Sequence, residues 1–327
     1  MKRKLLVTFL ALLLSFTFLA TSASAAKLAL NHVGATDHPY QFGADKFAEL
    51  VKEYTGGSVE VDVFPASQIA SGAKAIEMVQ TYTLDIAVES TMALSNFVPE
   101  VGVLDLPFLF ETKQQAFAVL DGPVGQLLDE KAANAGLKIL AWWDNGFRNI
   151  TSRKGFVKQP SDLAGLKIRT PESTVFLKTF ETLGAVPTAM AVAEVFSSLQ
   201  LGIVDAQENP DANNIRNKYP EVAPYYTITK HIYTAEPVVM NLDAFNAFSE
   251  EEQAAILKAA KEAGDYQREV SLKFDDENLE YIKESGAELF IVEDMSAFRE
   301  ACKSVYEFFR PQFGDLIDMI QKEIAAQ

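Results

Sequence analysis

Two arginines in apolar surroundings carry the clearest chemical signal in this acidic chain. Arg148 lies in the segment WDNGFRNIT, and Arg169 follows 21 residues later in GLKIRTPES. A guanidinium in an apolar environment needs an anionic partner, because an unpaired buried charge is very costly. Its planar fork also matches a carboxylate in a bidentate geometry. The arginines therefore indicate either a site for an anionic ligand or internal salt bridges. Candidate internal partners are Glu89, Asp144 and Glu172.

The elements that would position these arginines are two strands. Each arginine lies at or just beyond the end of a predicted strand, in residues 137–144 for Arg148 and 161–171 for Arg169. In open α/β sheets, ligands bind outside the carboxyl ends of the strands. The placement is therefore typical of a binding site.

The rest of the chain alternates strands with helices. Alternation and helical spacing predict strands in 26–34, 58–65 and 84–90, and helices in 38–57, about 71–82 and, in two pieces, 112–136. The pattern restarts after Arg148, with helices in 173–184 and 191–202, a strand in 203–210 and a returning strand in 234–245. This βαβα order predicts a mainly parallel sheet covered by helices.

A long helix is predicted near the C-terminus. Ser249 and Glu252 form a capping-box pattern, and no proline follows before Pro311. A helix running to Ser285 would be on the order of 50 Å long at 1.5 Å per residue. This exceeds the helix of an ordinary single domain, so we expect it to bridge two lobes. Gly264 marks a possible bend in it.

Residues 1–25 are predicted to be a cleaved export signal. A basic start, Lys2-Arg3-Lys4, precedes an apolar run, and the small residues Ala23-Ser24-Ala25 match a cleavage site. The apolar run is rather short for a membrane anchor. The pattern fits bacterial Sec-type export and a periplasmic location.

Composition excludes several classes of function. The formal net charge is −16, and it becomes −19 once the three basic residues of the signal are removed. Nucleic acid and anionic membranes are therefore not expected partners, because phosphate binding needs a basic surface. Cys302 is the only cysteine, so a disulfide within the chain and a Cys-rich zinc site are excluded.

Catalytic signatures are absent from the sequence. It contains no P-loop, no GxGxxG after a strand, no HExxH and no GxSxG. His32, Asp37 and His38 could be imagined as a metal site, but a loop that caps the following helix is the favoured interpretation. No cofactor or metal is expected.

In combination and order, several segments resemble one family, the DctP-type substrate-binding proteins of tripartite ATP-independent periplasmic (TRAP) transporters. The resemblance covers essentially the whole mature chain. It rests on VFPASQIASGAKAIEMVQTYTLDIAV, LDLPFLF, NGFRNITS, DLAGLKIRTPES, VDAQENP and FSEEEQAAILKAAKEA.

The resemblance implies a two-lobed α/β fold, like that of periplasmic binding proteins, with hinge strands and a long helix spanning both lobes. The first lobe would comprise residues 26–146 and about 235–273, and the second 147–234 and about 274–327. Ligand would bind in the cleft between them. The family pattern implies that Arg169 forms a salt bridge with a ligand carboxylate, that Arg148 is a further anion contact, and that Asn209 hydrogen-bonds the same end of the ligand.

Further residues are similar to those of acidic-sugar binders in the family. Glu89, Asn31 and His32 would contact ligand hydroxyls. Trp143, Phe147 and Tyr233 could pack against a sugar face or belong to the core. The aspartate near Ser71 and the aromatic residue near Val192 that sialate binders carry are missing, which argues against sialic acid.

We therefore expect a ligand-capture protein and not an enzyme, acting as a monomer that delivers a small carboxylate to membrane permease subunits. A hydroxylated monocarboxylate such as a uronate is favoured, because Glu89 would repel a second carboxylate. A C4-dicarboxylate is the alternative. Two further hypotheses are an exported organic-acid enzyme using Glu89 or His32 as a base, and a sensory protein that signals to a receptor kinase.

Overall fold

The computed structural model describes residues 25–327. The predicted export signal, residues 1–25, lies outside the described residues except for Ala25. Within the part described, no helix has both the length and the apolar character needed to cross a bilayer.

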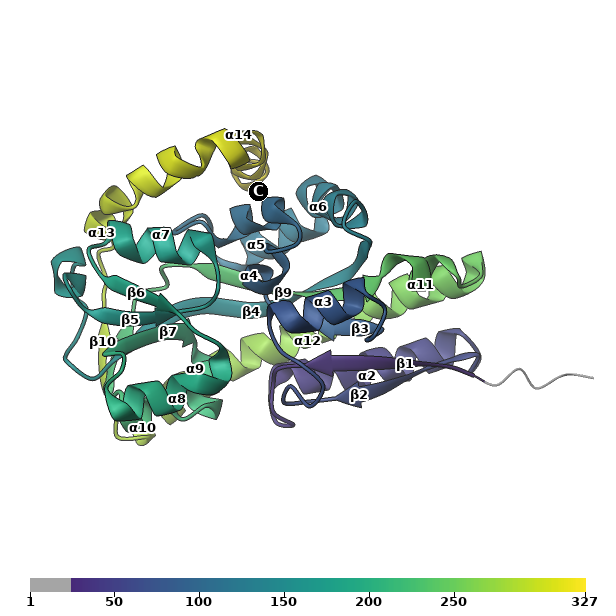
Figure 1. The fold of residues 1–327 in the computed structure, drawn as a ribbon, viewed down its shortest axis with the longest axis horizontal. Helices are drawn as coiled ribbons and strands as arrows, with labels where there is room; N and C mark the ends of the chain where they lie inside the picture. The colour runs from purple at the N-terminus through teal and green to yellow at the C-terminus, as the bar shows by residue number, and fades with distance from the viewer. Residues whose placement is uncertain (1–24) are drawn as a thin grey trace, which may run out of the picture.

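Two groups of strands form the two lobes of the α/β fold, which lie at opposite ends of the molecule (Figure 1). The first lobe contains β1 (Ala26–His32), α2 (Pro39–Tyr54), β2 (Val59–Phe64), α3 (Ala73–Gln80), β3 (Ile86–Val88), α4 (Thr91–Leu94), η1 (Pro99–Asp105), α5 (Lys113–Asp121), α6 (Pro123–Ala133) and α11 (Leu242–Asn246). The second lobe contains η2 (Pro160–Leu163), β5 (Lys167–Thr170), α7 (Thr174–Thr182), β6 (Val186–Ala189), α8 (Val192–Leu201), β7 (Ala206–Pro210), α9 (Asp211–Arg216), α10 (Tyr219–Val222), β8 (Tyr225–Ile228), β10 (Glu288–Ile291) and α13 (Ser296–Ala301).

Two long strands join the lobes. β4 (Leu137–Ser152) pairs antiparallel with β9 (Tyr233–Asn241) as far as Phe147, and from Arg148 onward it pairs with β7. The sheet order is β2-β1-β3-β9-β4-β7-β5-β6, so β9 and β4 occupy its middle. The predicted strand 137–144 is therefore too short. Arg148 lies inside a hinge strand and not beyond a strand end.

Parallel pairing within each lobe confirms the predicted βαβ pattern. β1 pairs parallel with β2 and β3, and β5 pairs parallel with β6 and β7. The carboxyl ends of β5 and β7 consequently meet at one edge of the second lobe, facing the first. This geometry delivers Arg169 and Asn209 to the same place.

The predicted long helix is confirmed as α12 (Glu250–Glu284), 35 residues without a break. Its capping box is present, because Ser249 Oγ accepts from the Glu252 amide and Glu252 Oε2 accepts from the Ser249 amide. α12 contacts α2 in the first lobe and α9 in the second. At 1.5 Å per residue it spans about 52 Å, enough to reach across both.

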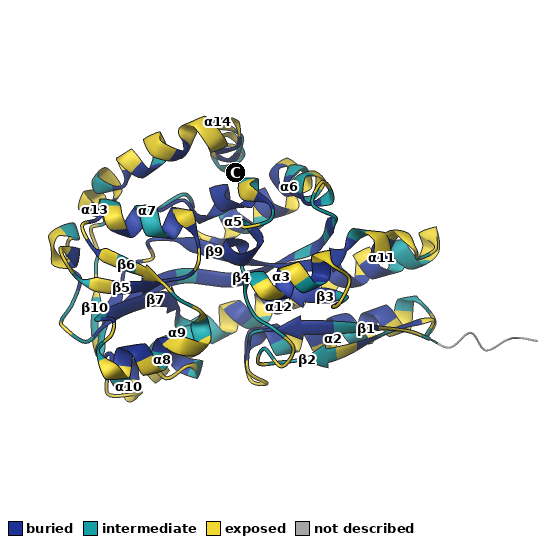
Figure 2. Cartoon of the chain, in the orientation of Figure 1, coloured by how far each residue is buried: buried dark blue, intermediate teal, exposed yellow. Residues whose placement is uncertain are grey.

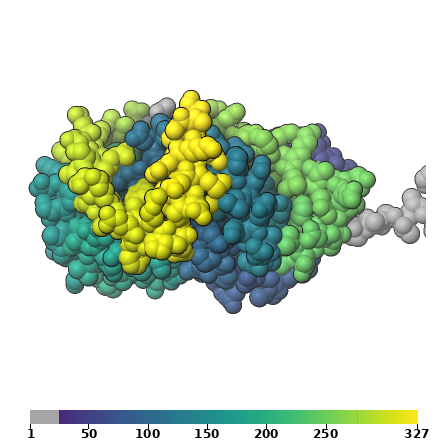
Figure 3. Space-filling view, turned by 90° about the horizontal axis from the view of Figure 1, so that it is seen from above, coloured from purple at the N-terminus to yellow at the C-terminus, as the bar shows by residue number. Residues whose placement is uncertain are grey.

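A second helix also joins the lobes. α14 (Lys303–Ala325) packs on α5, α6 and η1 of the first lobe and on α7 of the second. Figure 3 shows the C-terminal residues in yellow lying over both the teal and the blue parts of the surface. The predicted lobe boundaries, near residues 146, 234 and 273, fall inside β4, β9 and α12, which run through both lobes. The boundaries stay a prediction.

Apolar residues cover both faces of the sheet. One core lies between the first-lobe strands and the helices α2 and α12, and a larger one lies beneath α5, α6, α7 and α14. Figure 2 shows the central strands buried and the outward helix faces exposed. Trp143 is fully buried where α2, β4 and α12 meet. Gly264 lies within α12 and faces the Trp143 ring, where an added Cβ would be at an ordinary contact distance of 3.5 Å from Cδ1; the possible bend at this glycine stays a prediction.

The close approach of α2 and α12 predicts that Gly43→Ala destabilises the fold. The added Cβ would lie 2.9 Å from Gln267 Cβ and 3.0 Å from Trp143 Cη2. Overpacking of this kind lowers the free energy of unfolding by about 1–3 kcal/mol. Urea denaturation measures the change. Glu53→Ala, at an exposed position of the same helix, is the control and should stay within about 0.5 kcal/mol. Equal stability of the two variants would contradict the packing argument.

Candidate functional site

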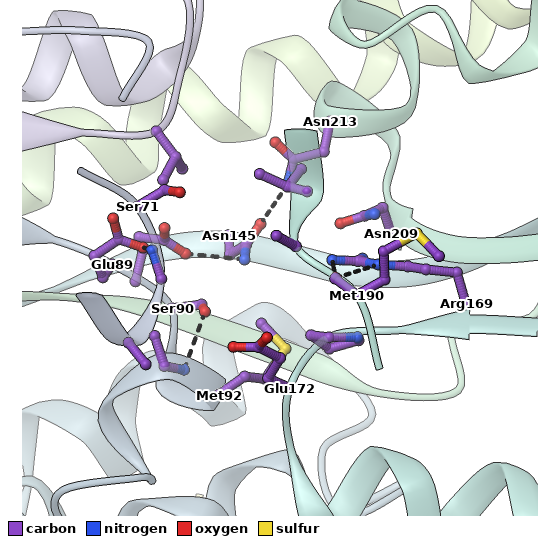
Figure 4. A pocket seen from close by; sticks show the side chains of 18 of the residues that line it. Ser71, Glu89, Ser90, Met92, Asn145, Arg169, Glu172, Met190, Asn209 and Asn213 are labelled. Atoms are coloured by element: carbon purple, nitrogen blue, oxygen red, sulfur yellow. Dashed lines mark hydrogen bonds between the residues drawn. The ribbon is translucent and has the colours of Figure 1, made fainter. Parts of the chain in front are cut away.

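A cavity of about 170 Å³ lies between the lobes and is lined by residues from both lobes and from the hinge strands. Its polar side chains are Ser71, Glu89, Ser90, Asn96, Asn145, Arg148, Arg169, Glu172, Asn209, Asn213, Asn217 and Glu236. Figure 4 shows Arg169 and Asn209 on one side and Glu89 and Ser71 on the other. The predicted residues Arg148, Arg169, Asn209 and Glu89 are thus brought together.

Arg169, near the carboxyl end of β5, is a buried cation without an acidic partner. Its Nε and Nη2 both donate to the carbonyl oxygen of Met190, at 2.9 and 2.6 Å. Only 4% of the residue is exposed, and among the described residues no carboxylate forms a salt bridge with it. Burial lowers the pKa of the guanidinium to about 10, so it remains charged at neutral pH. The site therefore holds a fixed positive charge that an anion would neutralise.

Arg148, in contrast, already has a partner, which is Glu208 and none of the three candidates from the sequence. Its Nε donates to Glu208 Oε2 at 2.5 Å, and its Nη2 donates to Glu208 Oε1 at 2.9 Å. His231 Nε2 lies 3.2 Å from the same carboxylate. Burial alone would raise the pKa of Glu208, but Arg148 and His231 outweigh it and lower the pKa. Arg148 is thus held in place by an internal ion pair while it lines the cavity.

Asn209 is oriented by its neighbours on both sides. Its Oδ1 accepts from Arg148 Nη2 at 3.1 Å, and its Nδ2 donates to Gln207 Oε1 at 2.7 Å. Arg169 pairs in register with Gln207 on the adjacent parallel strand. Side chains two residues apart share a face of a strand, so Asn209 lies on the same face as Arg169.

The opposite end of the cavity carries two buried acids. Glu89 accepts from the Gly72 amide at 3.0 Å through Oε2, whereas its buried Oε1 has no partner among the described residues. Burial, with the nearby Glu236, raises the pKa of Glu89 well above its ordinary value. Burial likewise raises the pKa of Glu236 to about 8. Both shifts favour the neutral form of the carboxyl, and a neutral carboxyl can donate as well as accept a hydrogen bond.

Asn145 enters the cavity because of a β-bulge. Asp144 pairs with Ala235 and Gly146 with Thr234, which leaves Asn145 as the extra residue of β4. A bulge re-aims the side chain of the extra residue. Gly146 adopts φ of 115°, a conformation that glycine tolerates and other residues rarely adopt.

Asn31 and His32 lie outside the lining of this cavity. The Asn31 side chain donates to the Ala70 carbonyl at 2.8 Å and accepts from the Ile69 amide at 3.1 Å, so it fixes the loop after β2. His32 Nε2 lies 3.3 Å from Gln41 Oε1, and burial lowers the pKa of the ring to about 4.

The three aromatic residues also lie away from it. Trp143 belongs to the core between α2 and α12. Tyr233 is buried and packs edge-on against Phe110 and Phe147, with centroids 5.7 and 5.5 Å away. Phe147 lines a second, larger cavity of about 520 Å³ instead. The buried cation of that cavity, Lys113, is paired with two aspartates, so it offers no free charge to an anion.

The candidate metal residues serve other purposes. His38 caps α2, because its Nδ1 accepts from the Tyr40 amide at 3.3 Å, which confirms the capping interpretation. Among the side chains that the structure describes, no group of three His, Cys, Asp or Glu is arranged to hold a metal ion.

Several lining residues were missed from the sequence. Asn145 stands within the NGFRN segment itself, and Glu236 is an acid inside the otherwise apolar stretch TAEPVVM. An acid in an apolar strand is the kind of signal that identified the arginines. Asn213 carried no comparable signal, and Glu172 was named only as a candidate salt-bridge partner of the arginines.

The sequence and fold have known relatives. The family model of the bacterial extracellular solute-binding proteins of family 7, DctP, matches residues 30–312, and the chain belongs to this family. It is 33% identical over 309 residues to the 2,3-diketo-L-gulonate-binding periplasmic protein of Escherichia coli K12, covering 93% of this chain and 94% of the relative.

Two solved structures are similar over nearly their whole length. A TRAP periplasmic solute-binding protein from Sulfitobacter sp. NAS-14.1 with bound β-D-galacturonate has a TM-score of 0.88 and 30% identity, covering 90% of this chain and 99% of that one. One from Sulfurospirillum deleyianum with bound succinate has a TM-score of 0.85 and 35% identity, covering 91% and 99%. The predicted family and two-lobed fold are confirmed, and the family serves transport and not catalysis.

The buried acids predict a pH dependence of stability. Glu236 ordinarily releases its proton near pH 4.5 and in the folded protein near pH 8, surrounded by Glu89, Asp105, Tyr40 and Arg148. Between these values the folded state binds more protons, so the free energy of unfolding falls as the pH rises. Glu236→Gln should make this fall shallower in urea denaturation at pH 5, 6, 7 and 8. Parallel curves for the wild type and the variant would show that Glu236 is ionised in the folded protein.

Proposed function

We propose that the protein captures a hydroxylated monocarboxylate, such as a uronate or another sugar acid, in the periplasm. The main support for this proposal is Arg169. It is a buried guanidinium that lines the cavity, and no acidic side chain of the described residues forms a salt bridge with it. A buried charge of this kind is stabilised by an anionic partner with a matching planar fork. A ligand carboxylate supplies that partner.

The two ends of the cavity support a polarised ligand. The carboxylate binds Arg169, with Arg148 and Asn209 beside it, and hydroxyls extend toward Glu89 and Glu236. Arg148 and Arg169 are the cationic residues in the lining, and both lie at the same end. A second carboxylate at the far end would therefore be desolvated without a counter-charge.

The relatives support the same choice of ligand class. The similar structure from Sulfitobacter holds β-D-galacturonate, and the relative from Escherichia coli binds 2,3-diketo-L-gulonate. The structure from Sulfurospirillum holds succinate, which keeps a C4-dicarboxylate as the second candidate. Such a ligand would have to be short enough for both carboxylates to reach the arginines.

The two lobes provide the conformational change that transport requires. A ligand that contacts both lobes shifts the population toward the closed form. Closure excludes water and strengthens the ion pair with Arg169. The closed protein, a monomer exported by a cleaved signal, then delivers its ligand to the membrane permease subunits of a TRAP transporter.

A thermal-shift screen tests the ligand class. The panel is D-galacturonate, D-glucuronate, D-galactonate, D-erythronate and succinate. A ligand at about a hundred times its Kd stabilises the folded state by about 2.7 kcal/mol, which raises the Tm by several degrees. At least one sugar acid should produce this rise. A rise with succinate and none with the sugar acids would replace the proposed ligand by a dicarboxylate.

Arg169→Met should abolish the ligand-induced rise, because it removes the charge and keeps most of the side-chain volume. Arg310→Met is the matched control, since Arg310 is an exposed arginine paired with Asp318. This control should keep the full rise. An undiminished rise in Arg169→Met would refute the carboxylate clamp.

A further inference from the structure

A chain of three hydrogen bonds passes from one lobe to the other and ends at the cavity. His38 Nε2 lies 3.1 Å from Asn213 Oδ1. Asn213 Nδ2 donates to Asn145 Oδ1 at 3.0 Å, and Asn145 Nδ2 donates to Glu236 Oε2 at 2.9 Å. A dashed line in Figure 4 marks the bond between Asn213 and Asn145. The last three residues of the chain all line the cavity.

The direction of this chain is fixed at its start. His38 Nδ1 accepts from the Tyr40 amide, a group that can only donate. In a neutral imidazole the proton must then be on Nε2, so His38 donates to Asn213. Each amide oxygen accepts from the residue before, and each amide nitrogen donates to the next. Glu236 Oε2 is the final acceptor.

The neutral state of His38 is also supported by its surroundings. The residue is 3% exposed, and Arg216 on α9 and His32 on β1 are the charged or titratable groups that act on it. Burial is the largest influence and lowers the pKa of the ring to about 3. A neutral His38 ring is therefore favoured, which agrees with the direction of the hydrogen bonds set by the Tyr40 amide.

Each link comes from a different part of the fold. His38 precedes α2 in the first lobe, Asn213 lies on α9 in the second, Asn145 is the bulged residue of β4, and Glu236 lies on β9. The contact between His38 and Asn213 exists only while the lobes touch. The orientation of the Asn145 amide, and through it the Glu236 carboxyl, is thus tied to lobe closure.

We propose that Glu236 is a ligand-binding residue for hydroxyls remote from the carboxylate, and that His38, Asn213 and Asn145 orient it when the lobes close. The inference rests on the proposed function, because it assigns the far end of the same cavity. A hydroxyl bound to Glu236 stabilises the row of hydrogen bonds from His38 to Glu236. These hydrogen bonds, formed when the lobes are closed, in turn stabilise the bound hydroxyl. Acids without such a hydroxyl gain nothing from this coupling.

Two other contacts between the lobes do not reach Glu236. Arg216 Nε lies 3.5 Å from Asp37 Oδ2, whose side chain is 69% exposed, and Asn96 Nδ2 donates to the Glu172 carbonyl at 3.3 Å. An exposed ion pair contributes little to stability. Asp37→Asn therefore serves as a control that weakens a contact between the same two elements without breaking the chain.

The test compares Asn213→Ala with Asp37→Asn in stopped-flow binding of D-galacturonate, D-glucuronate and D-galactonate, using each acid that the wild type binds. Loss of the two part-buried hydrogen bonds of the Asn213 side chain should raise the dissociation rate about tenfold. The association rate should stay near that of the wild type. Asp37→Asn should change the dissociation rate by less than about twofold.

The role of Glu236 is tested by two variants, one conservative and one that removes the carboxyl group. Glu236→Gln keeps a neutral group that both donates and accepts, so its Kd for the same acids should stay within about threefold of the wild type. Glu236→Ala should weaken binding about tenfold or more. Wild-type binding by Glu236→Ala, or equal rates for Asn213→Ala and Asp37→Asn, would overturn this inference alone. Failure of the wild type to bind any of the three acids would overturn the proposed function as well.

Discussion

A buried positive charge without an internal counter-charge is the constraint on which the site depends. Arg169 is held by a single carbonyl oxygen, that of Met190, and no acidic side chain that the structure describes forms a salt bridge with it. Arg148 shows the opposite arrangement, since Glu208 neutralises it within the fold. The pairing of Arg148 matters for the charge of the cavity. Because Arg148 is paired with Glu208, Arg169 is the guanidinium of the lining that has no salt bridge among the described residues and is open to a ligand carboxylate.

The hinge strands supply the rest of the cavity. β4 contributes Asn145 and Arg148, and β9 contributes Glu236, so the floor of the site belongs to the elements that both lobes share. Burial raises the pKa of both Glu89 and Glu236, which favours the neutral, hydrogen-bonding form of the two acids. A cavity with a cation at one end and neutral carboxyls at the other is complementary to a sugar acid, although the protein as a whole carries a formal charge of −16.

The sequence predicted the fold and part of the site. The bulge in β4 is one reason why the other site residues could not be predicted. The βαβ order, the capping box at Ser249 and the strand-end placement of Arg169 depend on local patterns, which are readable. The faces of Trp143 and Phe147 are not, because the register between β4 and β9 shifts at 139/141 and again at 144/146. Each shift breaks the alternation from which a face is inferred. Glu236 reaches the cavity through the pairing of β9 with β4, where its partner Trp143 lies far earlier in the sequence.

The pairing of β3 with β9 has a consequence for how the protein folds. Ile86 of β3 pairs with Met240 of β9, 154 positions further along. Contacts between such distant segments form slowly, because a long loop must be closed before they are gained. A chain that emerges from its N-terminus, during synthesis or export, cannot complete the first lobe until β9 has followed. Two sets of strands can begin to pair from contiguous sequence: β1, β2 and β3 within residues 26–88, and β5, β6 and β7 within residues 167–210.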